Sequence, residues 1–401
     1  MKSCIHMKPV RRFFRKRIWS LAGAILISYL AFTSDIDPSF KLQFEQITSI
    51  QGLSNNTVYD ITQDDEGFIW IATREGLNKF DGQVITSYYK KNFTGIPDNF
   101  IEQVLVTSSE KLIVGTQKGA CIYDKETNSF SQLLHKGKSL GDMNSIIEVS
   151  SGELLISSNN GLYKTDKDLN LQKISDLIFR DLCEYRTGII WGLYEDDILL
   201  LNLEGDIIRK YSNGMESVGN FDLSSSNIEC LYKDSKGEIW LGTKRDGIGF
   251  YDRETDRFFS LKLKMGVNPI EDNFVRVINE DMLGRLWIGT ESGLFIYDVD
   301  SESLTFYGQC FVPTQKGLND KAIYSIFRSR DNMMWVGTYF GGVNYSSLFQ
   351  KGFNRIYADG GHEGLNGNAV SEIIETSDHM IWIATEDGGI SILDPETGVF
   401  K

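Results

Sequence analysis

One short unit recurs along this 401-residue chain, and its period constrains the fold more than any other feature. The clearest copy is Asp64–Asp81, where an Asp-x-x-Gly turn, a Trp-Ile-Ala-Thr strand, a Thr-x-x-Gly turn and a strand ending in Phe-Asp follow one another. Eight copies align on one apolar anchor position. The anchors are Trp70, Ile113, Leu155, Trp191, Trp240, Trp287, Trp335 and Trp382. The anchors recur at intervals of about 40–50 residues, and the sequence between them favours strands. Both properties are typical of the blades of a β-propeller.

Each copy of this unit predicts four short antiparallel strands. The alternating run Val58–Thr62 predicts the innermost strand. The Asp-x-x-Gly stretch that follows predicts a tight turn, because Asp hydrogen-bonds its own backbone and Gly accepts a positive φ. The tryptophan strand comes next, and we expect its indole to pack between neighbouring blades, where replacing a buried Trp with Ala costs about 3–5 kcal/mol. A strand ending in Phe80-Asp81 and an outer strand near Ser87–Tyr89 complete the blade.

A second kind of internal similarity indicates how the ring closes. Phe44–Ile47 followed by Gly52–Asn56 resembles Phe353–Ile356 followed by Gly364–Asn368. Both pairs of segments look like an outer strand that leads into a new first blade. We therefore expect residues around 42–48 to supply the outer strand of the seventh blade, which removes the open strand edges that would invite aggregation.

These repeats predict an all-β chain: one seven-bladed β-propeller of four-stranded antiparallel blades, plus the first blade of a second propeller. We expect the first ring over residues 40–350 and the additional blade over residues 351–401, with the second ring starting near residue 353. An eight-bladed ring, in which residues 42–48 pair with the blade after Trp382, would contradict this prediction.

The N-terminus has the pattern of an export signal. Its first seventeen residues are basic and contain no acid, and the apolar run Ile18–Phe32 follows. We predict a signal peptide or an N-terminal membrane anchor over residues 1–34, which places the remainder of the chain in the periplasm. The net charge of −14 makes nucleic acid an unsuitable partner. The few cysteines are widely spaced, so we expect no metal site, no cofactor and no disulfide framework.

Two segments of the sequence resemble a known family. The segments Gly67–Asp81 and Trp335–Tyr345 resemble the two-component regulator propeller repeats in the periplasmic sensor region of Bacteroidetes hybrid two-component system histidine kinases. The resemblance extends over about residues 40–401. It implies an extracytoplasmic ring that senses a glycan fragment, an oligosaccharide or another small ligand, and signals to a histidine kinase in a longer protein.

That longer protein would add a downstream propeller, a β-sandwich and kinase modules as partners, and a homodimer is one assembly that such an architecture permits. The residues themselves contain no ATP-binding glycine motif, no phosphoacceptor histidine in a helical context and no basic helix-turn-helix. The resemblance therefore implies the sensory half of such a protein, and we expect no enzyme activity in these residues.

Candidate ligand-binding residues follow from the strand order of a blade. The turn between the second and third strands emerges on the same face as the connection between blades, and that face is the usual place for function on a rigid scaffold. Aromatic faces and planar polar groups suit sugars, and Arg and Lys suit acidic sugars. The candidates on these turns are Arg74, Glu75, Lys244, Arg245, Asp246, Tyr339 and Phe340. The alternative is that they are solvated turn residues.

Two other function classes stay open at this point. One is a propeller glycosidase or lyase of the sialidase-like kind, which would need two carboxylates at a defined separation. The acids of this chain sit mostly in repeated turn positions, and this repetition favours a structural role. The other is a protein-interaction propeller that binds no small glycan.

Overall fold

The computed structural model describes residues 42–212, 228–261, 264–265, 268–270, 274–310, 317–348, 364–395, 397 and 399–400. Residues 43–401 group into one unit by their contacts. The signal or anchor predicted over residues 1–34 and the predicted start of the second ring near residue 353 lie outside the described residues. Within the described ranges, no helix is both long and apolar enough to cross a membrane.

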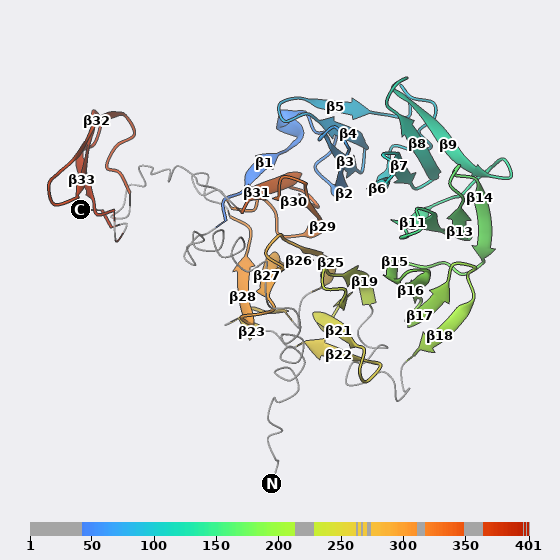
Figure 1. Ribbon diagram of the computed structural model, residues 1–401. Coiled ribbons are helices and arrows are strands. Elements are labelled where there is room, and N and C mark those ends of the chain that lie inside the picture. The colour runs from blue at the N-terminus through green and yellow to red at the C-terminus, as the bar shows by residue number, and fades with distance from the viewer. Residues whose placement is uncertain are drawn as a thin grey trace, which may run out of the picture. The chain divides into compact units, whose positions relative to one another are not determined.

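Seven antiparallel sheets stand around a common axis, and each of them is one blade (Figure 1). The first blade comprises β2 (Val58–Gln63), β3 (Ile69–Thr73), β4 (Gly76–Phe80) and β5 (Ile85–Tyr88). The second comprises β6 (Ile101–Val106), β7 (Leu112–Thr116), β8 (Gly119–Asp124), β9 (Ser129–His135) and a short fifth strand, β10 (Lys138–Ser139). The third comprises β11 (Met143–Glu148), β12 (Leu154–Ser158), β13 (Gly161–Thr165) and β14 (Leu171–Ser175).

The other blades follow the same order along the chain. The fourth comprises β15 (Leu182–Arg186), β16 (Ile189–Tyr194), β17 (Asp197–Asn202) and β18 (Ile207–Tyr211). The fifth comprises β19 (Ile228–Lys233), β20 (Ile239–Thr243), β21 (Ile248–Asp252) and β22 (Arg257–Leu261), followed by a small pair, β23 (Lys264–Met265) and β24 (Asn268–Pro269). The sixth comprises β25 (Val275–Glu280), β26 (Leu286–Thr290), β27 (Leu294–Asp298) and β28 (Ser303–Tyr307).

The seventh blade closes the ring with a strand from the other end of the chain. Its own strands are β29 (Ile323–Arg328), β30 (Met333–Thr338) and β31 (Val343–Ser347), and its outer strand is β1 (Glu45–Ile47). Strands β1 and β31 pair antiparallel, and they lie side by side in Figure 1. The predicted closure by residues around 42–48 is therefore confirmed, and so is the seven-bladed ring.

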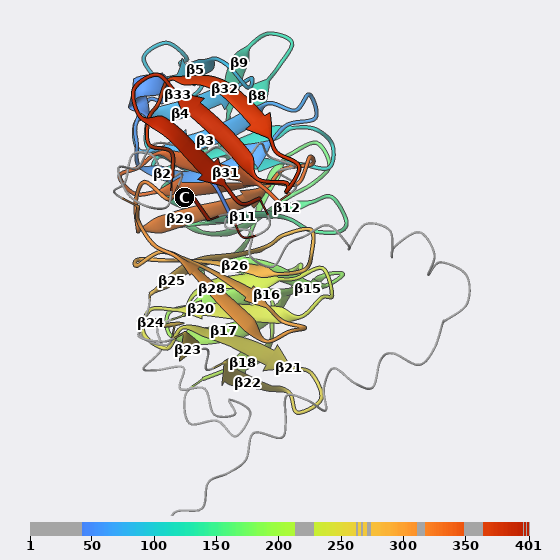
Figure 2. The same ribbon diagram turned by 90° about the vertical axis from the view of Figure 1, so that its left-hand side faces the viewer.

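The strands of each blade run from one face of the ring to the other, so the turns that join them lie on two opposite faces (Figure 2). We call the face with the turns between the first and second strands the framework face. It carries Asp64–Gly67, Asp234–Gly237 and Asp281–Gly284, whose glycines have φ between 77° and 98° as the turn requires. We call the opposite face the turn face. It carries the turns between the second and third strands and the connections between blades.

On the framework face, the turn aspartates also fix the tryptophans. In the first blade the Asp64 carboxylate accepts hydrogen bonds from the Phe68 backbone N–H at 2.9 Å and from the Trp70 indole at 2.7 Å. Asp234 and Asp281 hold the indoles of the fifth and sixth blades in the same way. Trp70 packs against Tyr123 of the second blade with ring centroids 4.9 Å apart. The prediction that the indoles pack between blades is confirmed, and the Asp-x-x-Gly turn orients them.

The fourth blade is the exception to this arrangement. Trp191 is fully buried, but among the described residues its indole nitrogen has no hydrogen-bond acceptor. Tyr185 stands six residues before it, where the first, fifth and sixth blades have aspartate and the seventh has serine. A buried donor without a partner costs about 1–3 kcal/mol, so this blade is held by ring packing rather than by a hydrogen bond to the indole.

The eighth copy of the unit forms a sheet that shares no strand pairing with the seven-membered ring. It comprises β32 (Val370–Glu375), β33 (Ile381–Thr385) and β34 (Gly389–Leu393). The Trp382 side chain is 42% exposed, whereas the equivalent Trp70 of the ring is fully buried. The repeat therefore specifies the strands of a blade by itself, whereas burial of the tryptophan depends on a neighbouring blade.

Candidate functional site

The turn face is built by one hydrogen bond that recurs around the ring. In the first blade the Arg74 backbone N–H, in the turn between β3 and β4, donates to the Thr57 carbonyl just before β2. Equivalent bonds join Gln117 to Phe100, Glu291 to Phe274 and Tyr339 to Ala322. Each bond ties a second-to-third turn to the start of the innermost strand. The prediction that these turns and the connections between blades share a face is therefore confirmed.

A β-bulge lies next to this bond at the start of nearly every innermost strand. In β2, Val58 pairs with Thr73 and Asp60 with Ala72, so Tyr59 is the extra residue. Among the described strands of the ring, six blades bulge at this point, and only the fourth does not. The bulge residues are Tyr59, Glu102, Asn144, Glu229, Arg276 and Tyr324. Bulges re-aim side chains beside active sites in many folds, so these six are candidates for function.

Aromatic bulge residues of the first and seventh blades meet across the blade boundary. Tyr59 packs edge-on against Tyr324 with ring centroids 5.8 Å apart, and on its other side it contacts Phe100 at 4.8 Å. Tyr324 stacks on Tyr339 of the β30–β31 turn at 5.1 Å, with the rings tilted by 24°. Phe340 lies at a steep angle to Tyr339 and is 71% exposed. The result is a continuous run of aromatic rings that ends in solvent.

Charged side chains continue this run into the sixth and fifth blades. The Arg276 guanidinium lies over the Tyr324 ring at 4.1 Å and over the Phe274 ring at 4.2 Å. It forms ion pairs with Glu291 of the β26–β27 turn and with Glu229 of the fifth blade. Lys244 of the β20–β21 turn pairs with the same Glu229 at 3.2 Å. We call Tyr59, Tyr324, Tyr339, Phe340, Arg276, Glu229, Glu291 and Lys244 the turn-face cluster.

Electrostatics confirm that distant parts of the sequence converge on Tyr59. Burial raises the pKa of its hydroxyl, Tyr339 raises it further, and the positive charges of Arg74 and Arg276 act against this rise. Burial likewise raises the pKa of the Tyr324 hydroxyl. Both hydroxyls are therefore protonated at neutral pH, and each can donate and accept a hydrogen bond.

Glu102 differs from the other bulge residues because a second carboxyl faces it. Burial and the neighbouring carboxyl of Asp142 raise the pKa of Glu102 to about 8. Glu102 Oε2 and Asp142 Oδ1 are both buried and have no other hydrogen-bond donor. With its pKa raised to about 8, the Glu102 carboxyl keeps its proton at neutral pH and can donate a hydrogen bond.

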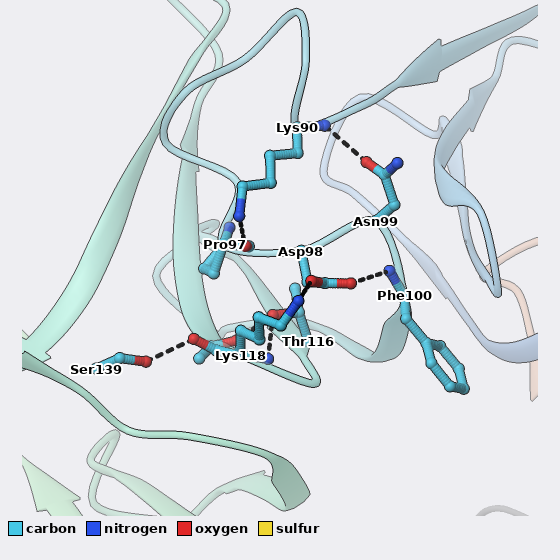
Figure 3. A network of polar contacts seen from close by, with 9 residues as sticks. Lys90, Pro97, Asp98, Asn99, Phe100, Thr116, Lys118 and Ser139 are labelled. Atoms are coloured by element: carbon cyan, nitrogen blue, oxygen red, sulfur yellow. Dashed lines mark hydrogen bonds and ion pairs between the residues drawn. The ribbon is translucent and has the colours of Figure 1, made fainter.

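A network beside Phe100 fixes the connection between the first and second blades (Figure 3). The Lys118 ammonium pairs with Asp98 at 2.6 Å, and the same carboxylate accepts from the Phe100 backbone N–H at 3.1 Å. Ser139 donates to the Lys118 carbonyl, and Lys90 holds the segment through the Pro97 carbonyl. These bonds position the backbone of Phe100 and hence the aromatic run that starts there.

The structure brings together part of the site predicted from sequence. Tyr339 and Phe340 lie in the turn-face cluster, Lys244 joins it through Glu229, and Arg74 acts on the Tyr59 hydroxyl. The other predicted residues lie on the same face, outside the set of side chains that defines the turn-face cluster. They are Glu75, Arg245 and Asp246.

Sequence reasoning missed the bulge residues. Tyr59 falls within a predicted strand, and the repeat does not single out Glu229, Arg276 or Tyr324. The repeat shows where a strand begins but not where its register shifts. A signal was present nevertheless. The residue after the first apolar residue of each innermost strand is the position at which the repeat changes chemistry from blade to blade.

Comparison with known proteins gives the same repeats an independent assignment. The family model described as "Two component regulator propeller" matches residues 52–75, 222–245, 269–292 and 317–340. A protein of Formosa agariphila named histidine kinase P4 is 44% identical over 66 residues, which is 16% of this chain and 5% of that protein.

Solved structures resemble the ring closely enough to show the fold. The extracellular domain of a putative hybrid two-component system from B. thetaiotaomicron matches 90% of this chain and 49% of its own length, with a TM-score of 0.69 and 24% identity. A second such domain from the same organism matches with a TM-score of 0.63 and 18% identity, over 90% of this chain and 53% of its own length. This chain thus spans about half the length of these two domains.

A virginiamycin B lyase from Staphylococcus aureus also matches, with a TM-score of 0.60 and 12% identity over 77% of this chain and 99% of the lyase. At such low identity the likeness concerns the propeller fold alone. The chain thus carries four matched two-component regulator propeller repeats, and their closure into a ring agrees with the fold of the solved extracellular domains.

Proposed function

We propose that this ring is the ligand-sensing region of a hybrid two-component sensor and that it binds a glycan fragment on the turn face. The bound state would be signalled to a histidine kinase in a longer protein. The ring would be exported to the periplasm by a signal peptide or held there by an N-terminal membrane anchor. The regulator propeller repeats, the kinase match and the likeness to extracellular sensor domains support this proposal. In the same scheme, residues 351–401 are the first blade of a second propeller.

The observation that carries the proposal is the chemistry of the turn-face cluster. Aromatic rings, protonated tyrosine hydroxyls and a guanidinium held between carboxylates come together from several blades. Sugars present C–H faces that pack on aromatic rings and hydroxyls that pair with planar polar groups, so this set of side chains fits an oligosaccharide. On the framework face, the bond between a turn aspartate and an indole recurs in three blades.

The test is direct binding of oligosaccharides to the purified chain by calorimetry. We expect Phe340→Ala and Arg74→Ala to weaken binding without lowering the melting temperature, since both side chains are exposed. Leu283→Ala removes an exposed apolar side chain from the framework face and serves as the matched control. Equal affinity of Phe340→Ala, Arg74→Ala and the unchanged protein would remove the turn face as the binding surface.

Lys244→Ala and Arg245→Ala refine the same test. Lys244 is tied to the cluster through Glu229, whereas Arg245 lies beside it on an exposed turn. A larger loss of affinity for Lys244→Ala than for Arg245→Ala is expected if the ligand binds over the cluster. A larger loss for Arg245→Ala would indicate that the ligand binds farther out, at the tips of the turns.

A propeller glycosidase fits the geometry less well. Glu102 and Asp142 form a pair of neighbouring carboxyls on the turn face, close enough to interact by a hydrogen bond. Glycosidases hold their two carboxyls about 5–9.5 Å apart to leave room for the sugar or a water. Glu229 and Glu291 are both paired with Arg276. Incubation of the chain with the same oligosaccharides, followed by analysis for cleavage products, separates an enzyme from a binding module.

A protein-interaction ring is the remaining alternative. Ile50 is 90% exposed in the short 3₁₀ helix η1 (Ser49–Gln51), which lies in the connection from the seventh to the first blade, and Phe340 is 71% exposed on the same face. Two exposed apolar side chains on one face can also mark a protein contact. In that case Ile50→Ser would weaken a protein complex, and no oligosaccharide would raise the melting temperature.

A further inference from the structure

The charges of the turn-face cluster are already paired with one another. Arg276 is shared by Glu291 and Glu229, and Lys244 adds a second cation to Glu229 at 3.2 Å. An acidic ligand would have to displace one of these carboxylates from its cation before it could pair. Breaking a partly buried ion pair leaves a charge without a partner, which is costly.

A neutral hydroxyl has no such requirement. It can accept a hydrogen bond from the Arg276 guanidinium and donate one to Glu291 at the same time, because a hydroxyl is both donor and acceptor. The ion pair stays intact while both of its partners contact the ligand. The hydroxyls of Tyr59 and Tyr324 add two more groups that can donate and accept.

The aromatic side of the cluster supplies the apolar contact. Tyr339 is stacked on Tyr324, and the exposed Phe340 stands at 69° to it with ring centroids 4.4 Å apart. Two rings at a steep angle can pack against two adjoining C–H surfaces of a sugar. Arg276 lies 4.1 Å from the Tyr324 ring, so the apolar contact and the hydroxyl-binding groups adjoin each other.

We propose that the turn-face cluster binds an uncharged oligosaccharide, with Arg276, Glu291 and Glu229 contacting hydroxyls while Tyr339 and Phe340 pack against a sugar ring. This rests on the proposed function and narrows its ligand class, since the exposed Arg74 and Arg245 by themselves would favour an acidic sugar. The contacts run across the fifth, sixth and seventh blades, so several sugar units rather than one are bound.

Two panels of probes test this inference with the full chain. One panel consists of neutral hexasaccharides, namely β-1,4-xylo-, β-1,4-manno- and α-1,5-arabino-oligosaccharides. The other consists of acidic ones, namely α-1,4-galacturonic acid and heparin-derived hexasaccharides. We expect a neutral hexasaccharide to bind with nearly the same affinity at low and at high NaCl. Salt screens the attraction between net charges, and this ligand has none. We expect Arg276→Ala to weaken it about ten- to a hundredfold.

Glu291→Gln separates the two ligand classes most sharply. It removes one carboxylate charge and leaves the side-chain shape unchanged. For a neutral ligand it should weaken binding about three- to tenfold, because a charged acceptor is lost. For an acidic ligand it should strengthen binding, because it frees Arg276. Glu126→Gln changes the same charge on an exposed turn of the framework face and is the matched control.

The outcomes distinguish the inference from the function on which it rests. Binding of the acidic panel alone, or a gain of affinity in Glu291→Gln, overturns the neutral ligand and leaves the sensor proposal standing. Binding of neither panel overturns both. If Arg276→Ala unfolds, then Phe340→Ser, which changes an exposed side chain, is still expected to weaken a neutral hexasaccharide without changing the melting temperature.

Discussion

The framework face and the turn face are built from the same strands, yet they differ in how far their chemistry repeats. On the framework face one bond recurs, in which an aspartate holds the indole of the following strand. On the turn face the bulged position is tyrosine in two blades, glutamate in two, and arginine or asparagine in others. The repeated residues maintain the fold, whereas the residues that vary form the candidate site. The experiments below test that division.

The largest effect is expected when the repeated bond is removed. The side chain of Asp281 is fully buried and accepts from Arg285 Nε at 2.8 Å and from the Trp287 indole at 2.9 Å. Asp281→Ala leaves both donors without an acceptor, so we expect a loss of about 3–5 kcal/mol in the free energy of unfolding, measured by denaturant titration. Glu126→Gln, which changes an exposed turn residue, is the control. A loss below about 1 kcal/mol for Asp281→Ala would show that the turn, not its carboxylate, orients the indole.

A second effect concerns buried carboxyls that lie in, or directly before, the innermost strands. These strands connect the two faces. Burial raises the pKa of Asp60 to about 7 and that of Asp181 to about 6. The folded ring therefore keeps protons that the unfolded chain has released above about pH 4, so stability is present at low pH and falls as pH rises through these pKa values. We expect a loss of about 2–4 kcal/mol between pH 5 and pH 8 in urea unfolding.

Asp60→Asn should flatten this pH dependence without removing the contact. Asp60 accepts from the Val104 backbone N–H of the second blade at 3.0 Å. The neutral amide of Gln103 makes the equivalent contact to the Ile146 backbone N–H of the third blade at 2.6 Å. Stability of Asp60→Asn that depends on pH as steeply as that of the unchanged protein would assign the effect to other groups.

The fourth blade offers a smaller and more specific comparison. Trp70→Phe loses the bond to Asp64, whereas Trp191→Phe loses no hydrogen bond, because that indole has no acceptor. Since a hydrogen bond to a charged group contributes about 1.5–3 kcal/mol, Trp70→Phe should cost more than Trp191→Phe by that amount. Equal losses in calorimetric unfolding would mean that the indoles act through their volume alone.

The smallest effect is expected at the exposed ion pair on the turn face. Lys118 is 68% exposed at its side chain and pairs with Asp98 (Figure 3). Exposed pairs contribute between about 0 and 1 kcal/mol, so Lys118→Met should leave the free energy of unfolding almost unchanged. A loss above about 2 kcal/mol would show that the ion pair, and not the Asp98 to Phe100 backbone bond, holds the connection between the first two blades.

The sequence was sufficient for the parts of the fold that depend on neighbours in the chain. The turn at Asp64–Gly67 and the tryptophan strand after it follow from local chemistry, and the similarity of Phe44–Ile47 to Phe353–Ile356 located the closing strand. The site depends on two things that a single sequence hides. One is the register shift that makes Tyr59 the extra residue of β2. The other is the curvature of the ring, which brings Tyr59 against Tyr324 although 265 residues separate them.

The closing strand also sets an order on how the molecule is made. Glu45–Ile47 leaves the ribosome long before its partner Val343–Tyr345 exists, and at roughly 5–20 residues per second that delay is on the order of 15–60 seconds. Throughout this time β1 has no strand to pair with and the growing arc of blades has two open ends. Strand β1 is short and carries the charged Glu45. Short and charged edge strands resist pairing with other chains, so β1 is suited to remain unpaired during synthesis. The ring thus closes in a single late step, when β1, the first of its strands to be synthesised, pairs with β31, the last.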